Sequence, residues 1–417
     1  MGLIVQKFGG SSLADAQKIH RAASRAIRAK EDGNQVVVVV SAMGDTTDHL
    51  TDLAYQVTDR PNRREMDQLM ATGEQVSIAL MAMAIHHTGH DAISLTGGQI
   101  GLRTDRSFGR ARIRQITERK RIVSLLNQGS IVIVAGFQGV DEAQNVTTLG
   151  RGGSDTTAVA LAASLGADIC EIYTDVDGIY SADPRIVPDA RKLDYIFYDE
   201  MLELSSLGAQ VMHSRSIELG KNYGVRLLVR SSFSDAKGTE IVQESTDLDQ
   251  VIVRGAALKR NLARVEFSRV PNKPGVASEI FNRTAEREIA VDDIIQVVHE
   301  GETTADISFT IDGTDIEAAR AMGQEIAAQI PGMLQRIRHG RAKVSVVGVG
   351  MRTHTGVASR MFEALRQAGV NIENISTSEI VISCVVKEED GERALRAVHA
   401  AMALEQEPVA QPAGDDR

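Results

Sequence analysis

The sequence has no tryptophan, only two cysteines and 4% aromatic residues. Cys170 and Cys384 each lie inside an apolar, strand-like run, which favours buried free thiols over a disulfide. The histidines are scattered, and no His/Cys cluster has the spacing of metal ligands. A disulfide scaffold and a dedicated metal centre are therefore not expected.

Long apolar runs and runs of positive charge are also missing. The formal net charge is −10 and no Lys/Arg run stands out, so nucleic acid is not an expected partner. No stretch reaches the ~18 consecutive apolar residues of a membrane helix. The apolar run at Leu3–Val5 is too short for a signal peptide. We expect a cytoplasmic protein without a membrane partner.

The first part of the chain alternates strand-like and helix-like segments. Gln35–Ser41 contains five consecutive valines and Ile131–Ala135 is fully apolar, as is typical of central parallel strands. Helices are expected at 66–87 and 113–128. The pattern predicts an α/β fold with a parallel sheet covered on both faces, whose ligands bind beyond the C-terminal strand ends. The residues at those ends are Lys7, Ser41, Gly97, Gly136 and Asp175.

The last part of the chain contains an internal repeat. Gly275–Ser278 with Phe281 recurs 81 residues later as Gly356–Ser359 with Phe362. Both copies follow the pattern of a ferredoxin-like α+β unit. The second copy lacks its last strand, which Val251–Leu258 would supply. A domain usually has roughly 100–200 residues. We expect a first domain at 1–245, followed by one repeat unit at 262–340 and a second repeat unit made of 251–258 and 341–404. The tail at 405–417 is expected to be disordered.

The glycine loop Thr147–Asp155 is the most informative stretch. Its three glycines surround Arg151, and the alanine-rich run Thr156–Leu165 that follows is typical of a helix. Such a loop offers free N–H groups and the positive end of a helix dipole to an anion. Arg151 adds a planar fork that suits a carboxylate or a phosphate. An ordinary strand-to-helix turn is the alternative for this motif taken alone.

A second glycine turn follows the first strand. Lys7 precedes Gly9 and Gly10 and places an ammonium beside backbone that can approach phosphates closely. Neither turn is a Walker A loop. Phosphoryl transfer needs positioning and positive charge around the moving group. The two turns together favour a small-molecule kinase, with Lys7 in its active site and not merely solvated. Asp155 then either orients Lys7 or is only a negative charge that the helix dipole favours.

Three further polar residues, Ser41, Thr47 and Glu74, are candidates for contacts with the substrate. Glu74 belongs to a helix with an apolar face and is either solvated or paired with a substrate ammonium. Ser41 and Thr47 lie where a strand leads into a helix, and are either helix caps or substrate contacts.

The segment Thr174–Arg185 follows another predicted strand. Its Asp175 and Asp177 resemble the start of a calcium loop, but the further acidic ligands and the closing Glu are missing. A turn with Tyr180 and Arg185 after a parallel strand fits nucleotide binding better. Any Mg²⁺ would be held mainly by the phosphates of the nucleotide.

The segments Lys7–Ser12, Ser41–Thr47, Gly73–Glu74, Thr147–Asp155 and Thr174–Arg185 together resemble the signatures of the aspartate kinase family, and the repeat resembles its paired ACT domains. The resemblance implies the amino-acid-kinase fold and ATP-dependent phosphorylation of the L-aspartate side chain to 4-phospho-L-aspartate, which opens lysine, threonine and methionine biosynthesis. It implies catalysis by Lys7 and Asp155, an α-carboxylate clamp at Arg151 and an ammonium partner at Glu74. It further implies substrate contacts from Ser41, Thr47, Gly152, Gly153 and Ser154, and ATP contacts from Lys7, Phe8, Gly9, Gly10, Thr174, Asp175, Tyr180, Arg185 and Gln210.

The paired ACT domains imply feedback inhibition by lysine, threonine or both, and a homodimer or higher oligomer. The glycine turns of the two copies offer N–H groups to an effector carboxylate, and polar residues after each helix offer acceptors to its ammonium. The candidates are Asn272, Gly275, Val276, Ala277, Asp292, Gln296, Thr355, Gly356, Asn371, Asn374 and Ser376.

Two positions depart from the family pattern. Gln210 stands where Lys is frequent near the nucleotide, and Asn272 stands where Asp is frequent in the first ACT unit. Two other functions fit the same sequence: another amino-acid kinase of this fold, and a non-catalytic amino-acid sensor. The intact Lys7, Glu74, Arg151 and Asp155 argue against the sensor.

Overall fold

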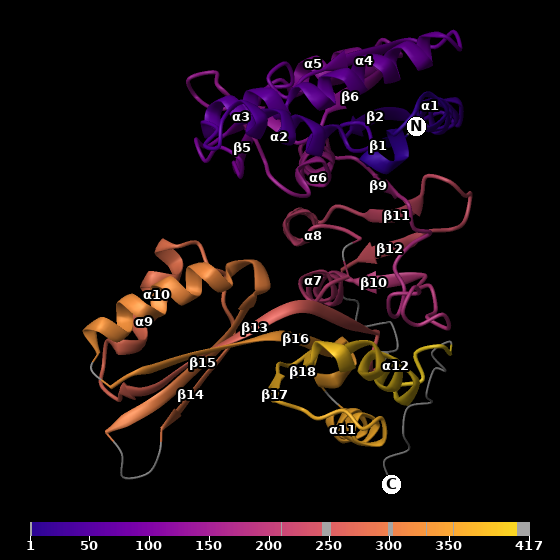
Figure 1. Cartoon of the computed structure of the whole chain (residues 1–417). Coiled ribbons are helices and arrows are strands. Elements are labelled where there is room, and N and C mark those ends of the chain that lie inside the picture. The colour runs from indigo at the N-terminus through magenta and orange to yellow at the C-terminus, as the bar shows by residue number, and fades with distance from the viewer. Residues whose placement is uncertain are drawn as a thin grey trace. The chain divides into compact units, whose positions relative to one another are not determined.

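The computed structural model describes residues 2–209, 211–243, 252–298, 303–330, 332–352 and 354–406 (Figure 1). They form two compact units. The first lies within the limits Met1–Tyr180, Lys192–Ser206 and Gln210–Leu248, and the second within Ser181–Arg191, Leu207–Ala209 and Asp249–Arg417. Two short segments of the predicted first domain, 181–191 and 207–209, thus group with the second unit.

An eight-stranded sheet forms the centre of the first unit. Its order is β10 (Tyr195–Phe197), β12 (Thr239–Val242), β11 (Leu227–Ser231), β9 (Ile169–Thr174), β1 (Leu3–Phe8), β2 (Gln35–Val40), β6 (Ile131–Ala135) and β3 (Ala92–Leu95). All neighbours are parallel except β11 and β12. Val36–Val40 are at most 1% exposed, because β2 has a strand on each side and side chains packed on each face. The predicted parallel sheet is confirmed.

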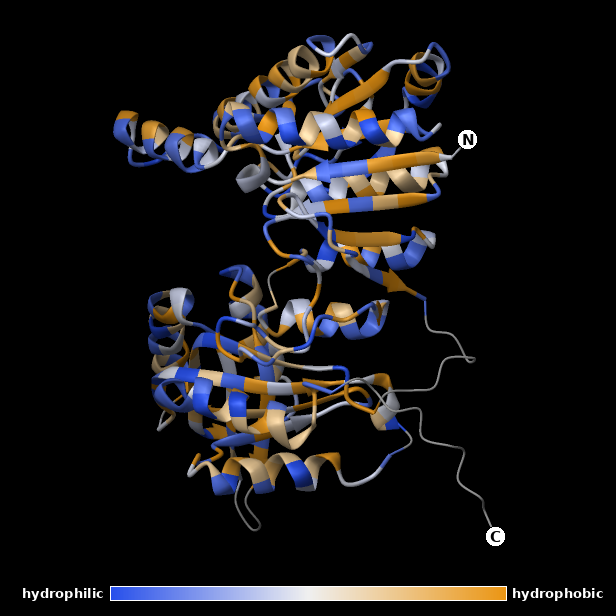
Figure 2. Cartoon of the chain, turned by 90° about the vertical axis from the view of Figure 1, so that its right-hand side faces the viewer, coloured by the Kyte–Doolittle hydropathy of each residue, from blue (hydrophilic) through white to orange (hydrophobic). Residues whose placement is uncertain are grey.

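Helices cover both faces of this sheet. Phe8, Val38 and Ile133 pack in one core with apolar side chains of α1 (Ala16–Glu31) and α4 (Thr72–His86). On the other face, where Val37 and Val39 are buried, α6 (Gly153–Leu165) lies against β1, β2 and β9. Figure 2 shows orange along the strands of this sheet and mixed orange and blue on the helices around it. The remaining helices of the unit are α2 (Thr46–Val57), α3 (Arg63–Met70), α5 (Arg119–Asn127), α7 (Tyr198–Ser206), α8 (Ser214–Tyr223) and the short 3-10 helix η1 (Gly10–Leu13).

Two predicted helices differ from the structure. The helix expected at 66–87 is divided at Ala71 into α3 and α4. The helix expected at 113–128 is wrong in its first part, where β5 (Ile113–Ile116) pairs with β4 (Leu102–Thr104). Pairing with a distant strand outweighs the local helical pattern here. These strands join β7 (Gln138–Val140) and β8 (Val146–Thr148) in a four-stranded sheet of order β5-β4-β7-β8.

One run qualifies as a membrane span by length and composition. It is Arg63–His86, a stretch of 24 residues, and 50% of its apolar window is buried inside the fold. This is weak evidence, since the core helix of a soluble protein passes the same test. The run also contains the buried carboxylates Asp67 and Glu74, which fits a core position.

The second unit is built on a six-stranded antiparallel sheet. Its order is β14 (Asp292–Val298), β15 (Thr304–Asp312), β13 (Gly255–Pro271), β16 (Leu334–Val347), β18 (Val381–Lys387) and β17 (Asn374–Thr377). Its helices are α9 (Val276–Glu286), α10 (Ile316–Gln329), α11 (Val357–Gln367) and α12 (Gly391–Ala401), with η2 (Gly313–Asp315), η3 (Val349–Arg352) and η4 (Glu388–Asp390). Figure 1 shows α9 and α10 beside one half of this sheet and α11 and α12 beside the other.

The long strands β13 and β16 belong to both repeats. Gly255–Lys259 pairs with the end of β16, whose next neighbour is β18. After a register shift near Asn261, which has a positive φ of 56°, Leu262–Ser268 pairs with the start of β16 and with β15. The first strand of each copy thus belongs to the same pair of long antiparallel strands, β13 and β16. The exact domain limits stay a prediction.

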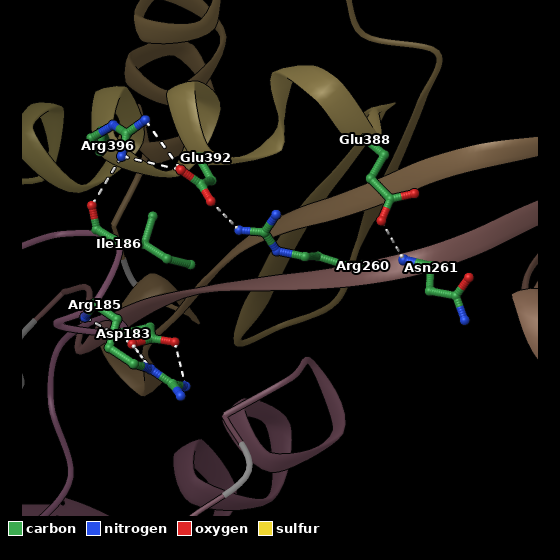
Figure 3. Close-up of polar contacts among 8 residues, drawn as sticks. All are labelled: Asp183, Arg185, Ile186, Arg260, Asn261, Glu388, Glu392 and Arg396. Atoms are coloured by element: carbon green, nitrogen blue, oxygen red, sulfur yellow. Dashed lines mark hydrogen bonds and ion pairs between the residues drawn. The ribbon is translucent and has the colours of Figure 1, made fainter.

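Within the second unit, the segment 181–191 is held by hydrogen bonds to α12 and β13. Ser181 Oγ lies 2.9 Å from His399 Nε2, and Ala256 N donates to Ser181 O at 2.7 Å. Arg396 Nη1 donates to Ile186 O at 3.1 Å, as Figure 3 shows. Arg396 also contacts Glu392, which accepts from Arg260 at 2.6 Å (Figure 3). These contacts join a loop, a helix and a strand.

Candidate active site

The C-terminal end of β1 and the first turn of α6 bring Lys7 and Asp155 together. Lys7 Nζ lies 2.6 Å from Asp155 Oδ1, and the two side chains are 12% and 11% exposed. An ion pair so nearly buried is little screened by solvent. The two residues predicted to be catalytic therefore form one charged pair at the C-terminal edge of the sheet.

The turns that follow β1 and β2 pack closely against one another. A Cβ on Gly10 would lie 2.9 Å from Ala42 O, so only glycine fits this position. Gly44 N donates to Gly10 O at 3.0 Å, and Ser41 N donates to Phe8 O at 3.1 Å. Gly9 is the neighbour of the ammonium, because a Cβ there would lie 3.4 Å from Lys7 Nζ. Phe8, Gly9, Gly10 and Ser41 thus share one corner with Lys7, and Thr47 is in the first turn of α2.

Glu74 is a buried carboxylate beside this corner. It is 3% exposed and lies in the first turn of α4. Its Oε1 accepts from Ala42 N at 3.1 Å, whereas Oε2 has no hydrogen-bond partner among the described residues. Burial raises the pKa of Glu74 to about 7, against the opposing hydrogen bond from Ala42. A carboxylate with a spare oxygen in this position is suited to accept a cation.

The glycine loop before α6 turns twice through left-handed backbone. Gly150 has φ 78° and Gly152, the N-cap of α6, has φ 67°. Arg151 between them is exposed. The first turn of α6 packs on the end of β6, since a Cβ on Gly136 would lie 2.6 Å from Ser154 Oγ. The result is an exposed guanidinium beside the positive end of a 13-residue helix.

The predicted nucleotide segment begins where β9 ends. Thr174 Oγ1 donates to Asp175 Oδ1 at 3.0 Å, and Tyr180 forms an isolated bridge with Lys192. Ser234 Oγ donates to Asp177 Oδ1 at 2.6 Å, so the loop after β11 braces this turn. Tyr173 before it stacks on Phe8 at 4.7 Å between ring centroids, which joins the segment to the Lys7 strand.

The two other predicted nucleotide contacts are Arg185 and Gln210. Arg185 belongs to the second unit, where its guanidinium donates to both carboxylate oxygens of Asp183, at 3.0 and 2.8 Å (Figure 3). Gln210 lies outside the described residues. Among the described residues, no group of three or more His, Cys, Asp or Glu side chains could hold a metal ion.

Sequence reasoning missed the residues that hold the glycine loop in place. Arg215 donates to Leu149 O at 2.9 Å and to Ala111 O at 2.7 Å. Asp67 accepts from Thr148 N at 2.7 Å, at the end of β8 and three residues before Arg151. Neither has a local signal, because Asp67 follows a charged run and Arg215 lies between two serines. The partners of Arg215 are 66 and 104 residues away in the chain, and Thr148 is 81 residues from Asp67.

The effector candidates lie in the second unit. Gly275 (φ 99°) and Gly356 (φ 90°) are the N-caps of α9 and α11, so both predicted glycine turns open helices. Asp292 is already paired, because its Oδ2 lies 2.6 Å from Lys343 Nζ, which also contacts Asp293 at 2.6 Å. The other candidates flank these helices and edge strands: Asn272, Val276 and Ala277 near the start of α9, Gln296 on β14, Thr355 and Asn371 around α11, and Asn374 and Ser376 on β17.

Comparisons with known proteins identify the family of this chain. Residues 2–231 match the amino acid kinase family, and residues 344–402 match an ACT domain. The chain is 50% identical over 404 residues to the aspartokinase of Bacillus sp. (strain MGA3), covering 97% of this chain and 98% of that one. It is 48% identical over 407 residues to the aspartate kinase of Pseudomonas putida, with 97% and 98% covered.

Solved structures show the same likeness. Escherichia coli aspartokinase III in complex with aspartate and ADP superposes with a TM-score of 0.80 at 26% identity, covering 96% of this chain and 99% of that one. The same enzyme in complex with lysine and aspartate gives a TM-score of 0.76 at 25% identity, with the same coverage.

Proposed function

The chain belongs to the aspartate kinases of the amino acid kinase family, and from that premise we propose how its residues share the phosphorylation of L-aspartate. The activity is ATP-dependent formation of 4-phospho-L-aspartate under feedback control by ACT domains. The single observation that carries the assignment of roles is the Lys7–Asp155 pair at the C-terminal edge of the sheet, beside the start of α6.

Lys7 stabilises the phosphoryl group in transfer, and Asp155 holds its ammonium in place. A side-chain carboxylate oxygen of the substrate attacks the γ-phosphorus of ATP, the bond from that phosphorus to the bridging oxygen breaks, and ADP leaves. The nucleophile is already an anion, so no general base is required. Catalysis then rests on positioning and on positive charge at the phosphoryl oxygens.

Arg151 and Glu74 bind the two α-substituents of aspartate. The Arg151 fork matches the geometry of a carboxylate, and the free Oε2 of Glu74 accepts from the ammonium. Ser41, Thr47 and the N–H groups of Gly152, Gly153 and Ser154 complete the substrate contacts. Charge on both sides selects an amino acid over a simple dicarboxylate.

ATP binds along the ends of β1 and β9. Phe8, Gly9, Gly10, Thr174, Asp175 and Tyr180 are its proposed contacts in the first unit, joined by Arg185 and Gln210. Mg²⁺ carried by the nucleotide would neutralise phosphate charge.

Threonine, lysine or both together are the proposed effectors, acting on a cytoplasmic homodimer or higher oligomer joined through the ACT domains. The related E. coli aspartokinase III has been crystallised in complex with lysine. The glycine turns before α9 and α11 supply N–H groups for an amino-acid carboxylate.

The substrate side of the proposal is tested by Arg151→Lys. This change keeps the charge but loses the bidentate fork, so the aspartate KM should rise while the ATP KM is nearly unchanged. Initial rates at varied aspartate and at varied ATP give both constants. Arg114→Lys, at an exposed arginine of β5, is the matched control. A shift in the ATP KM alone would assign Arg151 to the nucleotide.

A further inference from the structure

Asp67 is a buried carboxylate that accepts three hydrogen bonds. It is 1% exposed and lies on α3. Its Oδ2 accepts from Gly109 N at 3.0 Å and from Thr148 N at 2.7 Å, and its Oδ1 accepts from Thr148 Oγ1 at 2.8 Å. We propose that Asp67 is a positioning residue that fixes the Arg151 loop, the part of the glycine loop that carries Arg151, relative to Glu74. It thereby sets the distance between Arg151, which binds the substrate carboxylate, and Glu74, which binds the substrate ammonium. This inference rests on the roles proposed above.

On the Arg151 side, Asp67 holds both chain segments that approach the loop. Thr148 ends β8 three residues before Arg151, and its carbonyl accepts from Ala111 N at 2.8 Å. Gly109 lies against the loop itself, because a Cβ on Gly150 would be 2.9 Å from Gly109 O. One carboxylate thereby anchors the strand that leads into the loop and the segment that lies beside it.

On the Glu74 side, Asp67 belongs to the joint between α3 and α4. Ala71 N donates to Asp67 O at 3.1 Å, and α4, which carries Glu74 in its first turn, starts one residue later. Gln138 Nε2 donates to Ala71 O at 2.8 Å, and Gln138 is the ladder partner of Thr148. The joint and the loop are therefore tied by two routes, one through the Asp67 carboxylate and one through Gln138.

This arrangement has a consequence for substrate binding. The α-carboxylate and α-ammonium of an amino acid share one carbon, so their two partners must keep a fixed separation. Loss of the Asp67 carboxylate leaves three donors without their acceptor, and the two donors of Thr148 are buried, so the loop must move to find new partners. A shift of roughly 1 Å costs up to about 10²-fold in activity. The hydrogen bonds of the Asp67 carboxylate go to Gly109 and Thr148 and not to the proposed ATP contacts at the ends of β1 and β9.

The test compares Asp67→Ala with Asp67→Asn. Asparagine can accept both N–H bonds with its oxygen and donate its amide to Thr148 Oγ1, so it should restore what alanine removes. We expect Asp67→Ala to raise the aspartate KM about 10- to 100-fold, with the ATP KM unchanged and Asp67→Asn close to wild type. Asp141→Ala is the matched control, because Asp141 is also buried but accepts from Asn145 in the β7–β8 turn. It should lower the melting temperature without raising the aspartate KM.

The kinetic constants of the Asp67 variants decide whether Asp67 has this positioning role. An unchanged aspartate KM in folded Asp67→Ala, or an equal rise of both KM values, would overturn the proposal. If Asp67→Ala does not fold, Thr148→Val takes its place, with a several-fold rise in aspartate KM expected and Thr148→Ser as the rescue. The effects of Asp67→Ala and Arg151→Lys should be less than additive if Asp67 acts through the loop. Failure of Arg151→Lys to change the aspartate KM would instead contradict the role proposed for Arg151.

Discussion

At the scale of single residues, Glu74 is the group whose charge matters most near neutral pH. Its pKa is raised to about 7 by burial. As the pH falls through that value the free enzyme takes up a proton at Glu74, and a neutral carboxyl cannot pair with an ammonium. Binding of the ammonium favours the ionised form and lowers this pKa again. The pKa therefore links aspartate affinity to pH in one direction, with tighter binding at higher pH.

We expect the aspartate KM to rise as the pH is lowered, by about tenfold for each pH unit once Glu74 is mostly protonated. Glu74→Gln should give a high KM that no longer varies between about pH 6 and about pH 8. Steady-state rates at varied aspartate across this range measure the effect, with the ATP KM as the internal control. A wild-type profile that is already flat would contradict the assignment of Glu74 to the ammonium.

At the scale of elements, the start of α6 is the junction on which the site depends. Gly152 has φ 67°, and a Cβ there would lie 2.2 Å from His213 Cβ. Gly166, at the other end of the same helix, also has φ 67° but has nothing within 4 Å of its Cβ position. The two glycines share a left-handed backbone that would strain any other residue, and they differ in their surroundings.

We expect Gly166→Ala to lower the free energy of unfolding by about 1–2 kcal/mol and to leave kcat unchanged. Gly152→Ala should cost more stability and also lower kcat, because relief of the clash moves the first turn of α6 and with it Asp155. Urea unfolding and kcat on both variants check this. Equal losses of stability and equal kcat would show that His213 does not constrain the loop.

The main sheet and the corner of the site follow from local patterns. The valines of β2 and the apolar run of β6 are buried on both faces, as their composition predicts. Lys7 and Asp155 meet because parallel strands and the helices after them converge at one edge. β5 was missed because its pairing with β4 is a tertiary contact. Asp67 was missed for the same reason, since its donors at Gly109 and Thr148 are 42 and 81 residues away.

At the scale of the whole molecule, the Asp292–Lys343 contact bears on feedback control. Asp292 was predicted to accept an effector ammonium, and in the structure a lysine ammonium already lies 2.6 Å from it. Lys343 lies on β16, the strand that both repeats share, and its side chain is nearly buried. Its ammonium pairs with the carboxylate of Asp292, the first residue of β14. An effector ammonium at Asp292 would compete with this contact, which would couple effector binding to the strand that both repeats share.

We expect threonine, lysine or the pair to inhibit the wild-type enzyme, and Asp292→Asn to weaken that inhibition while uninhibited turnover is kept. A coupling of roughly 1–3 kcal/mol corresponds to a 5–150-fold change in effector affinity. Inhibition curves for each amino acid, alone and combined, supply the measurement, with Asp390→Asn, an ion-paired aspartate elsewhere in the unit, as control. Indifference of the wild type to every aspartate-family amino acid would leave the second unit with a purely structural role.

The central claim is tested most directly by ADP release from the full chain supplied with ATP and Mg²⁺ and a panel of L-aspartate, L-asparagine, L-glutamate and N-acetyl-L-glutamate. The same assay is run on Lys7→Ala. The account predicts turnover with L-aspartate alone, trapping of the acyl phosphate by hydroxylamine, and a fall in kcat of about 10²–10³-fold in the variant with little change in aspartate KM. Preferred turnover of another amino acid, or full turnover by Lys7→Ala, would contradict it.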